Sequence, residues 1–173
     1  MPDNGASNMS SIKNKFPQDL WNAAIYNQGL YSNALFANTQ KQAQDYFDAN
    51  VNTLIGHISN FSTSTMKFDF NQIEWLTLND TQRLKELGID ANKDMPNGYY
   101  IHELNNGTKT YTFTANTIIQ VSNPWDNLRS NLTVRVNDFP KWLADNNNGT
   151  GLWNINVNKN NNIVTSITEQ YVP

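Results

Sequence analysis

The chain has 173 residues, of which 16% are charged, and it carries a formal net charge of −3. The charged fraction is well below the roughly 25% of an average soluble protein, and asparagine fills the gap at about one residue in six. The twelve Lys and Arg residues are scattered singly, so no basic stripe is available to bind nucleic acid or an anionic membrane surface. Cysteine is absent, which excludes disulfides, thiolate metal sites and thiol nucleophiles.

The N-terminal segment 1–15 is polar and lacks the apolar stretch of a signal peptide. We expect it to be a disordered tail, or a cloning remnant left after a leader was removed. No apolar run approaches the roughly 18 residues of a transmembrane helix. Segment 16–173 suits a single domain, with a helical part over 16–60 and a β-rich part over 66–173.

Apolar residues recur at helical spacing from about residue 17 to residue 58. The pattern predicts two amphipathic helices with a break near Asn38 and Thr39. The apolar stripe of the second helix holds Ala43, Phe47, Val51, Leu54, Ile55 and Ile58. Packing on a sheet is the expected use of these stripes, and contact with a partner is the alternative. The polar faces are rich in amides instead of lysine, which argues against a membrane surface.

A strand is predicted over 66–71, because Met66, Phe68 and Phe70 alternate with polar residues. The alternation fails by Ile73, so a bulge or turn is expected between the two segments.

A short helix is expected next, because Asn79 suits an N-cap and Gln82 follows three residues later, as in a capping box. Leu84 and Leu87 share its inward face, and Gly88 ends it.

The segments 99–104 and 109–114 flank Asn105, Asn106, Gly107 and Thr108. Asn-Gly supplies the positive φ angles of a tight turn, so the sequence predicts a β-hairpin here.

Two further strands are predicted over 117–121 and 132–136, and Asp138 opens a short helix. The inward face of this helix holds Phe139, Trp142 and Leu143. After a loop over 146–151, a last hairpin pairs 153–157 with the terminal strand from Ile163. The elements predict an α+β fold in which N-terminal amphipathic helices pack on a curved antiparallel sheet, or partial barrel, of six to seven strands.

Asp90, Asn92 and Asp94 space oxygen ligands like the start of a calcium loop. The match ends at Met95, which replaces the required glycine, and at Ile101, which replaces the bidentate glutamate. Two histidines are too few for a zinc site without carboxylates, and no phosphate loop or serine-hydrolase motif is present. We therefore expect no metal and no cofactor.

Glu169 is placed by alternation on the same side of the last strand as Ile167 and Tyr171. An inward carboxylate must be paired, hydrogen-bonded or protonated. The conceivable partners are His102, Tyr100 and Arg135. Glu169 is then a structural anchor, or else a general acid or ligand contact. A glycosidase arrangement would need a second carboxylate nearby, from Glu74 or Glu103.

Tyr99 and Tyr100 are strand neighbours, so they point to opposite faces and one of them is expected to face outward. Together with Trp75 or Trp125, the outward tyrosine would form an aromatic platform for a sugar or a peptide. Aromatic residues that cap the sheet against the N-terminal helices would give the same pattern.

The order of motifs in the β-rich part is the basis for a family resemblance. The motifs are Ile73–Thr77, a short helix, Pro96–Ile101, Leu152–Val157 and Val164–Pro173. From Met66 to Pro173 the chain resembles small secreted lipoproteins of Gram-positive bacteria. It departs from them at Leu78, where they tend to carry glycine, and at 160–162, where their last turn holds a glycine.

The resemblance implies an extracellular protein, anchored to the cell surface through a lipid-modified cysteine that this sequence lacks, and it brings no enzymatic activity. The leading hypothesis is therefore a non-enzymatic binding domain for a cell-wall component, a small ligand or a protein partner. One alternative is a glycan- or peptidoglycan-acting hydrolase that uses Glu169. The other is a phage or surface-assembly subunit. The candidate binding residues are Glu169, His102, Tyr99, Tyr100 and Trp75.

Overall fold

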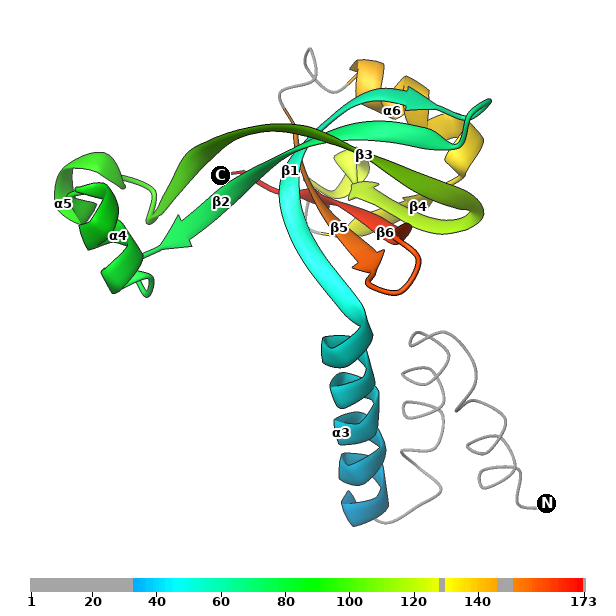
Figure 1. The fold of residues 1–173 in the computed structure, drawn as a ribbon, viewed down its shortest axis with the longest axis horizontal. Helices are drawn as coiled ribbons and strands as arrows, with labels where there is room; N and C mark the ends of the chain where they lie inside the picture. The colour runs from blue at the N-terminus through cyan, green and yellow to red at the C-terminus, as the bar shows by residue number, and fades with distance from the viewer. Residues whose placement is uncertain (1–32, 128–129, 146–150, 173) are drawn as a thin grey trace. The chain divides into compact units, whose positions relative to one another are not determined.

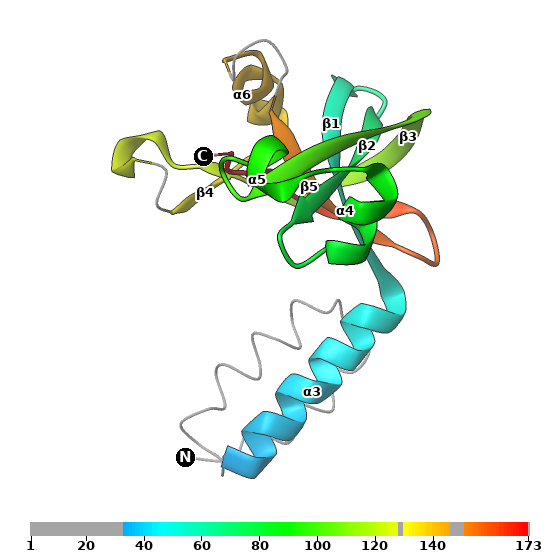
Figure 2. The ribbon, with the colours of Figure 1, turned by 90° about the vertical axis from the view of Figure 1, so that its left-hand side faces the viewer.

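The computed structural model describes residues 33–127, 130–145 and 151–172, and the chain divides into two compact units, Met1–Val51 and Asn52–Pro173. The expected α+β class is confirmed, because the described residues form helices and a six-stranded curved sheet (Figures 1 and 2). The expected tail over 1–15, most of the first expected helix and most of the loop over 146–151 lie outside the described residues.

The first unit contributes the helix α3 (Asn33–Asn50). It runs through Asn38 and Thr39, so the predicted break there is wrong. Neither residue is glycine or proline, and the helix propensities of Asn and Thr lie only a few tenths of a kcal/mol below those of good helix formers. A 2.6 Å ion pair between Lys41 and Asp45 adds support on the exposed side.

The strand β1 (Val51–Ser62) lies where the sequence predicted the second half of the second amphipathic helix, up to residue 58. Val51, Thr53, Ile55 and Ile58 are β-branched and favour strands. The spacing of the apolar residues fits both a helix and a partly buried strand, and pairing with β2 (Lys67–Thr77) decides in favour of the strand. The prediction of a helix up to residue 58 was therefore wrong.

Five strands of the second unit close a ring. The remaining elements of the sheet are β3 (Tyr99–Ser122), β4 (Asn131–Val134), β5 (Leu152–Asn158) and β6 (Ile163–Gln170). The sheet order is β2-β1-β5-β6-β3-β4, and an additional β2–β3 pairing closes the ring and leaves β4 outside it. β3 and β6 run parallel, whereas the other recorded pairs run antiparallel, so the sheet is mixed.

The spatial order β5-β1-β2-β3 is a Greek key, and β6 fills the gap between β5 and β3. Side-chain contacts from Thr53 to Asn156 and from His57 to Gly151 show that β1 and β5 run in opposite directions. A five-stranded Greek-key barrel is the architecture of OB-folds. The barrel unit therefore has an OB-type topology, with one additional edge strand, β4.

The barrel interior is a single apolar cluster. Its largest fully buried members are Phe68, Phe70, Phe113, Phe139, Ile119, Ile155 and Ile167. Phe139 is the first residue of α6 (Phe139–Asp145), which follows the 3-10 turn η2 (Val136–Asp138) and precedes β5. The predicted short helix is thus confirmed, with its start shifted by one residue from Asp138.

The β2–β3 ribbon continues beyond the point where β1 leaves β2 and ends in two short helices, α4 (Thr81–Leu87) and α5 (Ala91–Asp94) (Figure 1). A second apolar cluster joins them to the ribbon through Leu76, Leu84 and Met95. Gly88 ends α4 with a positive φ of 70°, as predicted.

The N-cap of α4 is Asp80, and the prediction of Asn79 was wrong by one position. The Asp80 side chain makes no capping bond to the helix. Its Oδ2 accepts hydrogen bonds from the backbone N–H and the hydroxyl of Thr77, at 2.7 and 2.9 Å. Gln82 does not complete a capping box either, because its Nε2 donates to Glu86 Oε1 at 3.2 Å.

The predicted hairpin around Asn105–Thr108 is wrong. Both flanking segments belong to β3, and both pair with β2: Asn71 opposes Thr108 and Ile73 opposes Glu103. One residue of β2 therefore faces four residues of β3, at 104–107, which form a wide bulge. Asn105 and Gly107 do adopt positive φ angles, of 52° and 78°, but they shape this bulge and not a turn.

Strands are found at the other predicted places: the segment 117–121 belongs to the last part of β3, and β4 ends at Val134, two residues before the predicted end. The irregularity expected in β2 before Ile73 is wrong, because β2 continues through Ile73 in regular register with β1, and the bulge at this level lies in β3. In the last hairpin Trp153, Ile155 and Val157 are buried, and β5 pairs with β6 in antiparallel register.

Candidate functional site

The β2–β3 ribbon has two chemically different faces. The pairing of β1 with β2 is regular from Asp69 to Ile73, so alternation along β2 holds across the bulge. Phe68 and Phe70 point into the barrel, and Leu76 on the same side packs against α4 and α5. Ile73 and Trp75 therefore lie on the outer face, which the helices α4 and α5 do not cover.

Trp75 and Tyr99 stack on this outer face. Their ring centroids are 4.4 Å apart and their planes differ by 11°. Thr77 opposes Tyr99 and Trp75 opposes Ile101, so the two rings are diagonal neighbours across the ribbon. Both side chains are partly exposed. The indole N–H and the phenol O–H make no hydrogen bond within the described residues, which leaves both groups available to a ligand or to water.

A histidine and a glutamate bridge over β2 beside this aromatic pair. His57 on β1 and Glu103 on β3 meet with Nε2 and Oε1 3.4 Å apart. His57 Nδ1 also lies 3.2 Å from the carbonyl oxygen of Gly151. Both ring nitrogens of His57 thus face an acceptor oxygen. The bridge passes over Ile73, which is paired with Glu103 and is only 1% exposed.

The outer face becomes polar toward the barrel. Asp69 accepts hydrogen bonds from Asn60 at 2.8 Å and from Thr110 at 2.6 Å. The bond from the Asn60 amide, and next the bond from the Thr110 hydroxyl, lower the pKa of Asp69 below its usual value. A carboxylate that is ionised at neutral pH disfavours a nucleic-acid backbone at this position, because such a backbone is recognised by basic and aromatic side chains together.

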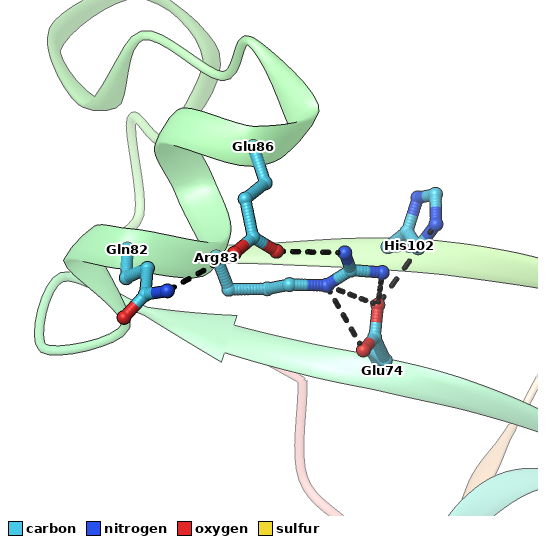
Figure 3. Close-up of polar contacts among 5 residues, drawn as sticks. All are labelled: Glu74, Gln82, Arg83, Glu86 and His102. Carbon is cyan, nitrogen blue, oxygen red and sulfur yellow. Dashed lines mark hydrogen bonds and ion pairs between the residues drawn. The ribbon is translucent and has the colours of Figure 1, made fainter.

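The inner face of the ribbon carries an ion-pair cluster between β2, β3 and α4 (Figure 3). Arg83 donates hydrogen bonds to the Glu74 carboxylate from Nε and Nη2, and the shortest, from Nη2 to Oε2, is 3.0 Å. Its Nη1 donates to Glu86 Oε2 at 3.2 Å. The hydrogen bond with Glu74, followed by the bond with Glu86, raises the pKa of Arg83. His102 Nε2 lies 3.9 Å from Glu74 Oε2. The cluster fastens α4 to the ribbon.

The five candidate residues of the sequence analysis therefore separate into three places. Trp75 and Tyr99 meet on the outer face. Tyr100 packs in the second apolar cluster, and His102 faces Glu74 on the inner side. Glu169 lies on β6, in the barrel wall. As predicted, Tyr99 and Tyr100 point to opposite faces.

Glu169 is held by the barrel backbone. Its Oε2 accepts a 2.7 Å hydrogen bond from the N–H of Ser122, the last residue of β3, which is 8% exposed. Of the three conceivable partners, His102 lies at Glu74, Tyr100 packs in the second apolar cluster, and Arg135 occupies the N-cap position of η2 without a side-chain capping bond. This geometry supports the structural-anchor interpretation of Glu169, because a carboxylate satisfies a nearly buried backbone donor there.

Asp90 and Asp94 cap the short helix α5. Asp90 Oδ1 accepts from the N–H of Asn92 at 3.0 Å, and Asp94 Oδ2 accepts from the N–H of Asp90 at 2.9 Å. Their carboxylates thus satisfy helix-terminal donors. In the described part of the chain, no group of three or more His, Cys, Asp or Glu side chains gathers as metal ligands.

Sequence reasoning missed the pairing of His57 with Glu103. His57 was expected on a helix, and its register against Glu103 depends on two strand pairings that no local pattern reveals. Gln72 and Lys109, which lie beside the bulge, were missed for the same reason.

Comparison with protein-family models, with curated proteins and with solved structures finds no match for the chain. None of the helices in the described segments has both the length and the apolarity needed to cross a membrane. What the fold and the site define is an OB-type barrel with an extended ribbon whose outer face presents a stacked aromatic pair.

Proposed function

We propose that the barrel unit is a ligand-binding domain, and that its ligand is a glycan of the cell wall. The observation that carries this proposal is the stacked, partly exposed pair of Trp75 and Tyr99 on the outer face of β2 and β3. OB-type barrels bind oligosaccharides and oligonucleotides on the face of their second and third strands. Fold alone does not establish function, and the side chains at that face supply the support for a ligand.

The chemistry of this face suits a sugar better than a nucleic acid. An aromatic pair offers a flat apolar surface for the C–H face of a pyranose ring, and the free indole N–H and phenol O–H offer polar contacts at its edge. The adjacent His57–Glu103 bridge adds the carboxylate of Glu103 as an acceptor. The net charge of −3 and the carboxylate of Asp69 disfavour phosphate backbones.

An extracellular, cell-surface location is part of the proposal. It rests on the resemblance of 66–173 to small lipoproteins of Gram-positive bacteria, in which a lipid anchor supplies the link to the membrane. Protease treatment of intact cells of the natural host, followed by detection with an antibody against the chain, tests it. Complete protection of the protein from protease in intact cells would exclude this location.

The binding proposal is tested by titrating the purified chain with soluble wall glycan fragments and by sedimentation with insoluble peptidoglycan. We expect Trp75→Ala to weaken binding about tenfold, because aromatic stacking contributes about 1–1.5 kcal/mol. Trp75→Phe keeps an aromatic ring, so its affinity for the glycan should lie between those of the wild type and Trp75→Ala.

Trp125→Ala is the matched control. Trp125 is 78% exposed and pairs edge-to-face with Trp142, outside the β2–β3 ribbon. The Trp125→Ala variant should bind wall glycans with the affinity of the wild type. Equal loss in the Trp75 and Trp125 variants, or no saturable binding of the wild type to any wall glycan, would contradict the proposal.

A further inference from the structure

We propose a second binding site, for an oxyanion such as a carboxylate or a phosphate group, in the pocket formed by the β3 bulge. The pocket has a volume of about 170 Å³. It is lined by Phe70, Gln72, Asn106, Gly107, Thr108, Lys109 and Tyr111. Gln72 shares its side of β2 with Phe70, so the pocket lies on the face of the ribbon opposite Trp75 and Tyr99.

The pocket has a positive charge that is not neutralised. Lys109 Nζ lies 5.0 Å from the ring centroid of Tyr111, a cation–π distance that holds the ammonium group over the aromatic floor. Within the described residues Lys109 forms no ion pair. None of the lining residues carries a carboxylate. The local charge of the lining is therefore +1 in a chain whose net charge is −3.

Hydrogen-bond donors surround this charge. The amide side chains of Gln72 and Asn106 make no hydrogen bond to any other described residue, so their NH₂ groups are available. Amide donors placed around one ammonium group form a set that complements an oxyanion.

The backbone of the bulge adds to this set. Asn105 and Gly107 have positive φ angles, of 52° and 78°, and the intervening Asn106 does not. Successive residues whose φ angles alternate in sign turn their N–H groups toward a common concave side, which is a recurrent anion-binding arrangement. The predicted hairpin motif Asn-Gly thus acquires a different use in the folded chain.

The size of the pocket limits the ligand to a single group. Pockets for drug-sized ligands have volumes of about 300–1,000 Å³. A volume of about 170 Å³ accommodates a phosphate or carboxylate with the atoms next to it, and leaves the remainder of a larger ligand outside. Phe70 and Tyr111, which are 1% and 5% exposed, give the site a rigid floor.

The test is a titration of the ¹⁵N-labelled full chain with sodium phosphate, sodium acetate and sodium glucuronate at constant ionic strength. We expect saturable shifts of the Gly107 and Thr108 amide signals with at least one of these probes. Phosphate and the two carboxylates separate a phosphate ligand from a carboxylate ligand, and glucuronate against acetate separates an acidic sugar from an isolated carboxylate.

Lys109→Gln should weaken this binding about tenfold or more, since it removes a charge-assisted contact. Asn106→Ala should weaken it less. Lys85→Gln is the control, because Lys85 is also exposed and forms no ion pair within the described residues, but lies on α4. Trp75→Ala should leave the shifts unchanged, which separates this site from the proposed glycan face.

Two results would overturn the proposal. One is shifts of Gly107 and Thr108 that grow linearly without saturation for all three probes. The other is an equal loss of binding in the Lys85 and Lys109 variants, which would indicate general screening of surface charge.

Discussion

Gly56 is the position at which the sheet is most sensitive to a single methyl group. It lies on β1 opposite Gln72, at the level of the β3 bulge. A Cβ built at Gly56 would lie 2.2 Å from the carbonyl oxygen of Asn71 and 2.9 Å from Gln72 Cα. These atoms belong to the backbone, so no side-chain rotation can relieve the contact. Gly56→Ala therefore requires β1 and β2 to move apart.

The cost can be estimated from this geometry. The Asn71 oxygen must retreat from 2.2 Å to at least 3.0 Å, the shortest distance that real Cβ atoms tolerate. Overpacking of this kind costs about 1–3 kcal/mol, and each ladder hydrogen bond that breaks adds about 1 kcal/mol. Alanine also lowers the conformational entropy of the unfolded chain, which stabilises the folded state by about 0.4–1 kcal/mol and offsets part of this loss. The expected net loss is about 3 kcal/mol, against a typical total of about 5–15 kcal/mol.

The measurement is urea unfolding followed by tryptophan fluorescence, in which the buried Trp153 reports on the barrel. A loss of about 3 kcal/mol corresponds to a decrease in Tm of about 10 °C. Gly88→Ala is the control: Gly88 has a φ of +70° and open space around its Cβ position, so we expect a loss of about 1 kcal/mol from backbone strain alone. A Gly56→Ala protein as stable as the wild type would refute the reasoning.

Two further predictions concern carboxylates. Glu169→Gln keeps an acceptor for the Ser122 N–H and should cost about 1 kcal/mol, whereas Glu169→Leu leaves that donor unsatisfied and should cost about 2–3 kcal/mol; equal losses in urea unfolding would argue against the anchor role. The hydrogen bonds from Thr77, first from its N–H and then from its hydroxyl, lower the pKa of Asp80 below its usual value. Asp80 therefore stabilises the fold above its unfolded pKa, and this contribution is lost as pH falls through its folded pKa. The stability difference between wild type and Asp80→Asn should be constant above pH 5 and should shrink below about pH 4, and a difference that grows on acidification would contradict this assignment.

The parts of the fold that were predictable are those that local patterns determine. The last hairpin alternates Trp153, Ile155 and Val157 with asparagines, and a period of two allows only a strand with one buried face. The end of α4 at Gly88 was also predictable locally, because glycine adopts the left-handed conformation of a helix C-terminus at little cost in free energy. Neither prediction required knowledge of a distant partner.

The segment from Val51 to Ile58 shows where local patterns fail. Its apolar residues at 51, 54, 55 and 58 satisfy the helical period, and α3 directly before it made a longer helix plausible. The segment forms a strand because it pairs with β2 on one side and with β5 on the other. Neither pairing can be inferred from the residues of the segment alone.

The bulge in β3 shows the same limit and has a consequence for function. Asn105 and Gly107 adopt the positive φ angles that a hairpin needs, so the local chemistry was correctly interpreted. A hairpin would have turned β3 back on itself, but β2 pairs with the segments on both sides of the bulge. The extra residues must then leave the ladder, and their backbone and side-chain donors lose their strand partners.

Backbone groups of residues 104–107, which lie outside the β2–β3 register, are not used in pairing with β2, whereas residues in the ladder offer a ligand their side chains alone. The candidate site follows a similar division. Trp75 and Tyr99 came together because strand register places them diagonally on the outer face, and Tyr100 and His102 were taken to the other face by the same register. Of the two faces, α4 and α5 cover the one with Tyr100. The inner apolar side of the ribbon packs against α4 and α5 at the tip of the ribbon. Its outer side and the bulge of β3 are the parts that remain exposed to a ligand.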